Sequence, residues 1–236
     1  MINLFNLQKK IHKKLNLKKK VVKFNFERFN AGNSKLSNSI LIFDLPAGSD
    51  GSCVDCSACE GTCYAKFAQV FYPSTKLFRD VNFELAKNYP ETLFTLLEMQ
   101  LSSTKNNVVR IHSSGDFYDE KYVDNWIELI HKFPKKRFYC YSKSPYILER
   151  ENLPKNLNVI SSFLTINGKK YLNYGNMKYL TELQEKDPSI FLCPATTHKA
   201  WDGKCGKECK VCLTHNKIGF LLHGNGRTKD IYNSLI

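Results

Sequence analysis

The sequence predicts an α/β fold, either a partial (β/α) barrel or a parallel sheet of about six strands. Short apolar runs of strand length alternate with longer segments of helical periodicity. Hydrophobic residues make up 42% of the 236 residues, which is enough to build a core. Polar or cysteine-rich segments follow most of the strand-like runs, as functional loops do at the carboxyl ends of parallel strands.

The first half of the chain predicts two strands separated by three helices. The run Ile40–Phe43 is apolar and Pro46 follows it closely, so we expect a buried strand there. The helices are expected near residues 64–72, 75–88 and 90–103. The β-branched run 108–112 predicts the second strand, which the turn-forming Ser113–Gly115 ends.

The second half of the chain continues the alternation. Residues 119–133 predict an amphipathic helix, because Tyr122, Trp126 and Ile130 fall on one side of it and Pro134 ends it. The remaining apolar, aromatic runs predict strands at residues 137–141, 158–164, 190–192 and 218–222, with a helix at 176–185. No linker divides these elements, so we expect a single α/β domain over residues 24–236.

The formal net charge of +13 is unevenly distributed. Residues 1–23 contain eight lysines and no acidic residue, and we define them as a basic N-terminal arm. Leu7, Ile11 and Leu15 recur every four residues, as on one face of a helix. The arm is either a solvated helix or a cationic segment that attracts the phosphates of a nucleic acid.

Cysteine usage and the absence of export signals indicate a reducing compartment. No run of 18 apolar residues predicts a membrane span, and no signal peptide is evident at the start. A cytoplasmic location is therefore expected. In that environment, eight clustered cysteines out of nine indicate metal ligands rather than disulfides. The ninth, Cys140, lies in an aromatic strand and is expected to be a buried small hydrophobe.

The first cysteine group consists of Cys53, Cys56, Cys59 and Cys63. Its C-x2-C-x2-C-x3-C spacing is that of [4Fe–4S] loops in bacterial ferredoxins, although Tyr64 stands where those loops have proline. No histidine joins the loop, which favours an iron–sulfur cluster over the alternative, structural zinc.

The second cysteine group consists of Cys193, Cys205, Cys209 and Cys212. Its C-x3-C-x2-C part has the spacing found in radical S-adenosylmethionine enzymes, but it lies close to the end of the sequence rather than after the first strand. A set of four cysteines indicates a closed site, which suits either zinc or a fully ligated second cluster.

A cofactor-binding site is expected around the end of the 108–112 strand. Its candidate residues are Arg110, His112, Ser113, Ser114, Gly115, Asp116 and, at the end of the next strand, Lys143. Arg110 and His112 alternate, so they are expected to share one face of the strand, and a buried cationic pair is costly unless it lines a cavity. The alternative is a helix-capping turn with a core histidine.

Several of these motifs occur together in one known family. They are Asp44–Gly48, Cys59–Ala65, Arg110–Phe117, Tyr141–Ser144, Cys193–Pro194 and Leu222–Gly224. In this order they resemble the gene product 88 family of phages and plasmids, over about residues 34–226 and without the basic arm. The resemblance implies a host-cell cytoplasmic setting and stresses Cys53, Cys59 and Cys63, but by itself it implies no activity.

More distantly, the chain resembles phage proteins related to the radical S-adenosylmethionine superfamily. That resemblance implies a [4Fe–4S] cluster on Cys53, Cys59 and Cys63 with one iron open to S-adenosylmethionine. The turn Ser114–Asp116 would then hold the methionine amine, an electron donor would be needed, and the substrate would be a nucleic acid or nucleotide. The alternative is a non-enzymatic module that binds nucleic acid or senses redox state, with both cysteine groups as closed metal sites.

Overall fold

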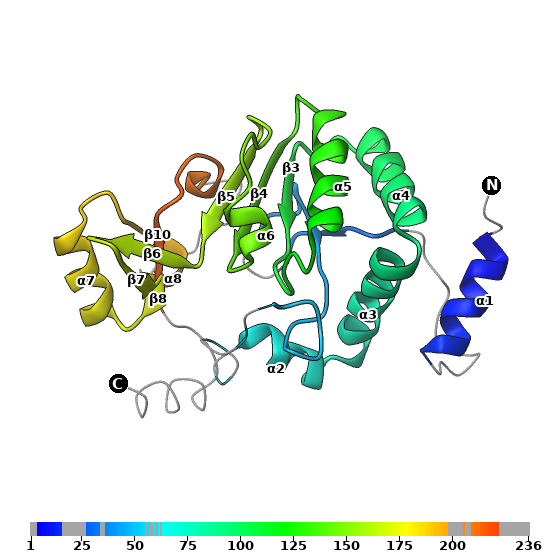
Figure 1. The fold of residues 1–236 in the computed structure, drawn as a ribbon, viewed down its shortest axis with the longest axis horizontal. Coiled ribbons are helices and arrows are strands. Elements are labelled where there is room, and N and C mark those ends of the chain that lie inside the picture. Colours follow the sequence, from blue (N-terminus) through cyan, green and yellow to red (C-terminus); the bar gives the residue numbers. More distant parts are fainter. Residues whose placement is uncertain are drawn as a thin grey trace.

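A five-stranded, mostly parallel sheet forms the centre of the fold (Figure 1). The structure is a computed structural model, and it describes residues 4–15, 27–33, 36–54, 56, 59, 61, 63–197, 205 and 209–221. The strands lie side by side in chain order: β1 (Asn30–Ala31), β2 (Ile40–Phe43), β3 (Val108–Ile111), β4 (Arg137–Ser142) and β5 (Leu157–Ser161). β1 is antiparallel to β2, and every later pair is parallel. The predicted α/β class is confirmed.

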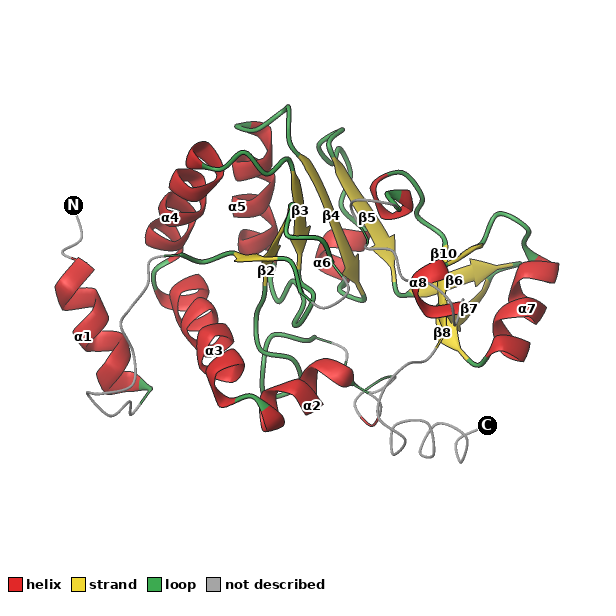
Figure 2. Cartoon of the chain, turned by 180° about the vertical axis from the view of Figure 1, so that it is seen from behind, coloured by secondary structure: helices red, strands yellow, loops and turns green. Residues whose placement is uncertain are grey.

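Helices cover one face of this sheet (Figures 1 and 2). They are α3 (Pro73–Asn88), α4 (Pro90–Ser103), α5 (Glu120–His131) and α6 (Pro145–Leu148), and α2 (Tyr64–Phe71) precedes them. The parallel strands follow one another in sequence, and right-handed crossovers therefore place the connecting helices on the same side. The same order of strands, with all connecting helices on one side, occurs in the wall of a (β/α) barrel. The described strands, however, form an open sheet. None of the described helices is both long and apolar enough to span a membrane.

Strand alternation assigns side chains to two different cores. Val109 and Ile111 of β3, with Phe138 and Cys140 of β4, pack against the helices and are at most 1% exposed. Cys140 is therefore a buried small side chain, as predicted. The intervening side chains lie on the opposite face, which we call the second face of the sheet.

The N-terminal helix α1 (Leu4–Lys14) packs against the helix-side core. Leu7 and Ile11 are 2% and 0% exposed, and Leu15 packs beside them. The predicted apolar face is thus confirmed, and its side chains are buried rather than solvated. Lys14 forms a 2.9 Å ion pair with Glu84 of α3. The four lysines of the arm beyond Lys14 lie outside the described residues.

The last part of the fold differs from the sequence prediction. The expected strand 158–164 is two strands, because the chain leaves the sheet at Ser162 and β6 (Phe163–Ile166) pairs in an antiparallel hairpin with β7 (Lys169–Leu172). Asn167 and Gly168 form the two-residue turn with φ angles of 51° and 76°.

The two last predicted strands exist but do not extend the main sheet. They are β9 (Phe191–Leu192) and β10 (Ile218–Leu221), and they form a separate three-stranded sheet with β8 (Tyr174–Gly175). The shorter elements around them are α7 (Met177–Lys186), α8 (Pro194–Thr197) and the 3-10 turn η2 (Val211–Leu213). About six strands were expected in one sheet; among the described residues the main sheet has five, of which four are parallel and β1 was not predicted.

Candidate functional site

The loops that follow β2, β3 and β4 meet at one edge of the sheet. The backbone N–H of Asp116 donates a 3.0 Å hydrogen bond to Ser52 Oγ, which directly precedes the first cysteine group. The Asp116 carboxylate accepts hydrogen bonds from Ser142 Oγ at 2.5 Å and from the backbone N–H of Lys143 at 2.9 Å. The predicted gathering of polar groups at the carboxyl ends of the strands is therefore present here.

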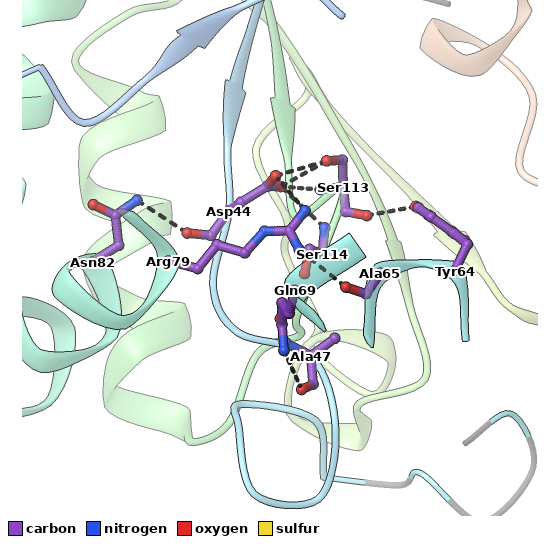
Figure 3. Close-up of polar contacts among 9 residues, drawn as sticks. All are labelled: Asp44, Ala47, Tyr64, Ala65, Gln69, Arg79, Asn82, Ser113 and Ser114. Atoms are coloured by element: carbon purple, nitrogen blue, oxygen red, sulfur yellow. Dashed lines mark hydrogen bonds and ion pairs between the residues drawn. The ribbon is translucent and has the colours of Figure 1, made fainter. Parts of the chain in front are cut away.

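A buried carboxylate, Asp44, organises the turn after β3 (Figure 3). It accepts hydrogen bonds from the backbone N–H groups of Ser113 and Ser114 at 2.7 and 3.0 Å. It also accepts one from Ser113 Oγ at 2.8 Å. Arg79 Nη2 lies 3.4 Å from the same carboxylate in a buried ion pair. Asp44 thus joins the end of β2 to the end of β3, a role that the sequence analysis did not identify.

Helices α2 and α3 are attached to the same network (Figure 3). Arg79 Nη1 donates to the carbonyl oxygen of Ala65 at 3.1 Å, and Asn82 Nδ2 donates to the carbonyl oxygen of Asp44 at 3.0 Å. The Gln69 amide exchanges two hydrogen bonds with the backbone of Ala47. These contacts fix the start of α2, and with it the last cysteine of the first group.

The first cysteine group is held at both ends against the turn after β3. Ser52 precedes Cys53 and bonds to Asp116, while Tyr64 follows Cys63 and donates a 2.5 Å hydrogen bond to the carbonyl oxygen of Ser113. All four thiols are half-buried. Burial, followed by repulsion from Cys56, Asp116 and Cys63, raises the pKa of the Cys53 thiol to about 12.

Gly115 is required by the close approach of two loops. Its φ is +80°, and a Cβ at this position would meet Ser52 Oγ and would lie 2.9 Å from the carbonyl oxygen of Leu45. From the sequence, this glycine is a candidate residue of a cofactor-binding site. In the structure, the segment that the glycine backbone approaches is the chain's own loop before Cys53.

Asp116 is buried, and its carboxylate is used within the chain. One oxygen accepts from the Phe117 N–H at 2.8 Å and from Ser142 Oγ, and the other accepts from the Lys143 N–H. Burial raises the pKa of Asp116, and the hydrogen bonds from Ser142, Lys143 and Phe117 oppose that increase. The helix-capping alternative does not apply to this residue, because the cap of α5 is Asp119, which accepts from the Tyr122 N–H.

The expectation that Arg110 and His112 share a face was wrong. His112 lies just beyond the end of β3 with a φ of +60°, and this left-handed conformation breaks the strand alternation. Its ring packs on the helix side, 4.5 Å from the Phe117 ring, and Nε2 lies 3.0 Å from the Tyr122 hydroxyl. Burial lowers the pKa of His112 to about 3, so this histidine is neutral at physiological pH.

Arg110 lies on the second face of the sheet, among tyrosines. Its guanidinium carbon is 5.4 Å from the centre of the Tyr141 ring, and Tyr139 neighbours it on β4. The Nε atom is buried and makes no hydrogen bond to any described residue. Lys143 points elsewhere, since its ammonium lies 5.9 Å from the centre of the Tyr174 ring.

The second cysteine group covers the second face of the sheet. Cys193, Cys205 and Cys212 pack there with apolar side chains of β2, β4, β5 and β10. The carbonyl oxygen of Cys205 accepts from the Ser37 N–H at 3.0 Å, and the backbones of Cys205 and Cys209 form an isolated β-bridge. The four cysteines therefore lie in one region, on the second face of the sheet. Most of the strands that they cover are distant from them in the sequence.

Burial raises the pKa values of the Cys193, Cys205 and Cys212 thiols, and repulsion among the thiols of this group adds to the effect. Thiols that repel one another in a half-buried environment are the donors that a soft cation would stabilise. Among the residues that the structure describes, no three histidine, cysteine or carboxylate side chains are close enough to hold one ion. The ligand sets named from the sequence therefore remain predictions.

Comparison with known proteins places the chain in a family. A sequence model described as Gene product 88 matches residues 9–212, a range that contains both cysteine groups. The Gene 88 protein of Mycobacterium phage D29 is 25% identical over 210 residues, covering 77% of this chain and 85% of the relative. The Gene 88 protein of Mycobacterium phage L5 is 30% identical over 118 residues, covering 46% and 48%. No solved structure matches.

The matched range differs at both ends from the one expected from the motifs. It begins at residue 9, so it includes part of the basic arm that was expected to lie outside, and it ends before Leu222–Gly224. It nevertheless covers the whole main sheet and both cysteine groups. The chain therefore belongs to the Gene product 88 family.

Proposed function

We propose that this chain is an iron–sulfur protein and a radical S-adenosylmethionine-like enzyme that acts on a nucleic acid or nucleotide. The observation that carries the proposal is the attachment of the first cysteine group, through Ser52 and Tyr64, to the turn after β3. The cysteine loop after β2 and the turn after β3, which would bind the ligand, are thereby held side by side. The open sheet, wound like a barrel wall, supports the same interpretation.

The donor set of the first group fits an iron–sulfur cluster. Thiolates are the ligands that such clusters use, and these four are half-buried in a short loop that no described histidine enters. Cys53, Cys59 and Cys63 would hold the cluster, which leaves Cys56 outside the ligand set. A [4Fe–4S] cluster with one open iron supplies the electron for radical chemistry on S-adenosylmethionine.

The turn after β3 retains capacity to bind an ammonium group. An ionised carboxylate has about four lone-pair positions for hydrogen bonds. Donors among the described residues use three of those of Asp116: two on one oxygen and one on the other. The remaining position lies on the oxygen that accepts from the Lys143 N–H. A ligand amine would bind there and would favour the ionised form of Asp116, whose burial disfavours it.

Metal analysis of anaerobically purified protein tests this proposal. The wild type should be brown and contain about four iron and four sulfide per cluster. Replacing Cys53, Cys59 and Cys63 by serine should remove one cluster, whereas Cys140→Ser, at a buried cysteine outside both groups, should leave the content unchanged. Colourless protein that contains only zinc would overturn the proposal.

A second candidate is a metal-stabilised module that binds nucleic acid or senses redox state. The observation that favours it is the orientation of α1, which buries Leu7 and Ile11 and leaves Lys9, Lys10 and Lys13 exposed. A helix docked in this way presents a fixed cationic surface to phosphates. In this case both cysteine groups are closed sites, and added S-adenosylmethionine produces no heat of binding in calorimetry.

A further inference from the structure

One cysteine of the second group receives a hydrogen bond from a tyrosine of the sheet. The Tyr141 hydroxyl donates to Cys212 Sγ at 2.8 Å. Tyr141 belongs to β4, the strand between Arg110 on β3 and Ile160 on β5. The contact therefore joins β4 directly to a thiol that the sequence assigns as a metal ligand.

A positively charged side chain, that of Arg110, lies against the ring of the same tyrosine. The guanidinium carbon of Arg110 lies 5.4 Å from the ring centre, within the range of a cation–π interaction. The buried Nε of Arg110 has no hydrogen-bond partner among the described residues. Tyr141 packs in the same cluster as Cys205 and Cys212 on the second face, so the cation lies beside this cysteine group.

Other contacts hold the cysteine backbone in place without touching the sulfur atoms. Asn158 Nδ2 donates to the carbonyl oxygens of Cys212 and His215 at 2.9 and 2.8 Å, and Arg137 donates to that of Leu213 at 3.0 Å. These bonds position η2 across the starts of β4 and β5. Tyr141 differs from these residues, because its hydrogen bond ends on a sulfur atom.

We propose that Tyr141 and Arg110 are positioning residues of a metal centre on the second cysteine group: the phenol orients and stabilises the Cys212 thiolate, and the guanidinium offsets the negative charge of four thiolates. The inference rests on the proposed function in one respect, since it assumes that Cys193, Cys205, Cys209 and Cys212 bind a metal. Residues in this outer position typically change metal affinity by about 10- to 100-fold when they are replaced.

The test uses the full-length chain with the first cysteine group replaced by serine, so that the second group is the remaining cysteine site. Cobalt(II) is titrated anaerobically, and the thiolate-to-cobalt charge-transfer absorption reports its binding. Tyr141→Phe removes only the hydroxyl. Tyr139→Phe is the matched control, because Tyr139 lies on the same strand and face, is buried, and makes no hydrogen bond to a described cysteine.

We expect Tyr141→Phe to weaken cobalt binding by about 10- to 100-fold and Tyr139→Phe to leave it unchanged. Arg110→Met should weaken binding in the same direction, and Arg110→Lys, which keeps the charge, should restore part of it. Equal affinities for the parent chain, Tyr141→Phe and Tyr139→Phe would overturn the inference while leaving the metal site intact. No charge-transfer absorption in the parent chain would instead remove the second metal centre itself.

Discussion

The hydroxyl of Tyr64 donates a 2.5 Å hydrogen bond to the carbonyl oxygen of Ser113, and so joins the end of the first cysteine group to the turn after β3. At the other end of the loop, Ser52 Oγ accepts from the Asp116 N–H and donates to the carbonyl oxygen of Pro46. The loop is therefore fixed at both ends whether or not it carries a metal. This attachment makes the first cysteine group face the turn after β3.

The close approach at Gly115 predicts a large loss of stability on substitution. Gly115→Ala places a Cβ against Ser52 and Leu45 at a positive φ, and Gly168→Ala is the matched control, because its φ is also positive but no atom lies within 4 Å. The left-handed conformation alone costs about 1–2 kcal/mol. Overpacking should add about 1–3 kcal/mol at Gly115. Equal free energies of unfolding in urea for the two variants would show that the loops do not touch.

The buried pair of Asp44 and Arg79 should be far more sensitive than an exposed one. Their side chains are 9% and 7% exposed, and Asp44→Asn leaves the guanidinium without its counter-charge. We expect a loss of about 3–5 kcal/mol in the free energy of unfolding. The exposed pair of Lys132 and Glu98, with a contact of 2.6 Å, is the control, and Glu98→Gln should cost less than about 1 kcal/mol. Similar losses in the two variants would mean that Asp44 does not organise the turn.

The local sequence pattern was sufficient to predict that polar groups gather at the edge of the sheet where the loops after β2, β3 and β4 meet. The carboxyl ends of parallel strands meet at one edge of a sheet, so strand assignment alone predicted that the polar segments after the strands would gather there. The contacts of Asp116 with Ser52 and Ser142 are an instance of that gathering. Asp44 was missed as an organising residue, because a single acidic residue after a strand has no distinctive spacing. Its importance comes from partners 35 to 70 positions away.

Two misassignments have identifiable local causes. Strand alternation predicts His112 on the face of Arg110, and the positive φ of His112 interrupts that alternation. The apolar run 158–164 predicts one continuous strand, although Asn167-Gly168, a strong hairpin signal, follows it closely and directs β6 to pair with β7. By contrast, the second cysteine group lies on the second face of the sheet because of long-range packing. The sequence contains no periodic signal for such packing.

The buried, neutral His112 predicts a specific pH dependence of stability. Burial lowers its pKa from 6.5 to about 3, so between these values the unfolded chain binds one proton more than the folded chain. Stability should therefore fall as the pH is lowered below 6.5, by about 1.4 kcal/mol per pH unit from this residue. His112→Asn, a residue that tolerates the left-handed conformation, should lack this part of the slope.

The measurement is urea unfolding of both proteins at pH 7, 6 and 5. Asp116 titrates in the wild type and in the variant, so its contribution cancels in the difference between the two slopes. Parallel curves for the wild type and His112→Asn would contradict a neutral buried imidazole at this position.

The exposed lysines of α1 should contribute to any affinity for nucleic acid. Replacing Lys9, Lys10 and Lys13 by glutamine should weaken binding and reduce the slope of log affinity against log salt by about 0.9 for each phosphate that the helix no longer neutralises. The apolar face of α1 is unchanged, so stability should be retained. The control replaces Lys121, Lys135 and Lys155, which are also exposed. Identical salt slopes for the two triple variants, measured by fluorescence anisotropy, would exclude α1 as a binding surface.

The most direct test of the central claim is the electron paramagnetic resonance spectrum of the reduced first cluster, recorded before and after addition of S-adenosylmethionine. The sample is the full chain reconstituted anaerobically, with the second cysteine group replaced by serine. Cys56→Ser is the matched partner of Cys59→Ser, because only Cys59 is assigned as a ligand. We predict a [4Fe–4S] signal that survives in Cys56→Ser, is lost in Cys59→Ser, and shifts when S-adenosylmethionine binds the open iron. A signal that is lost in both variants and does not respond to S-adenosylmethionine would show a closed four-cysteine cluster and contradict the account.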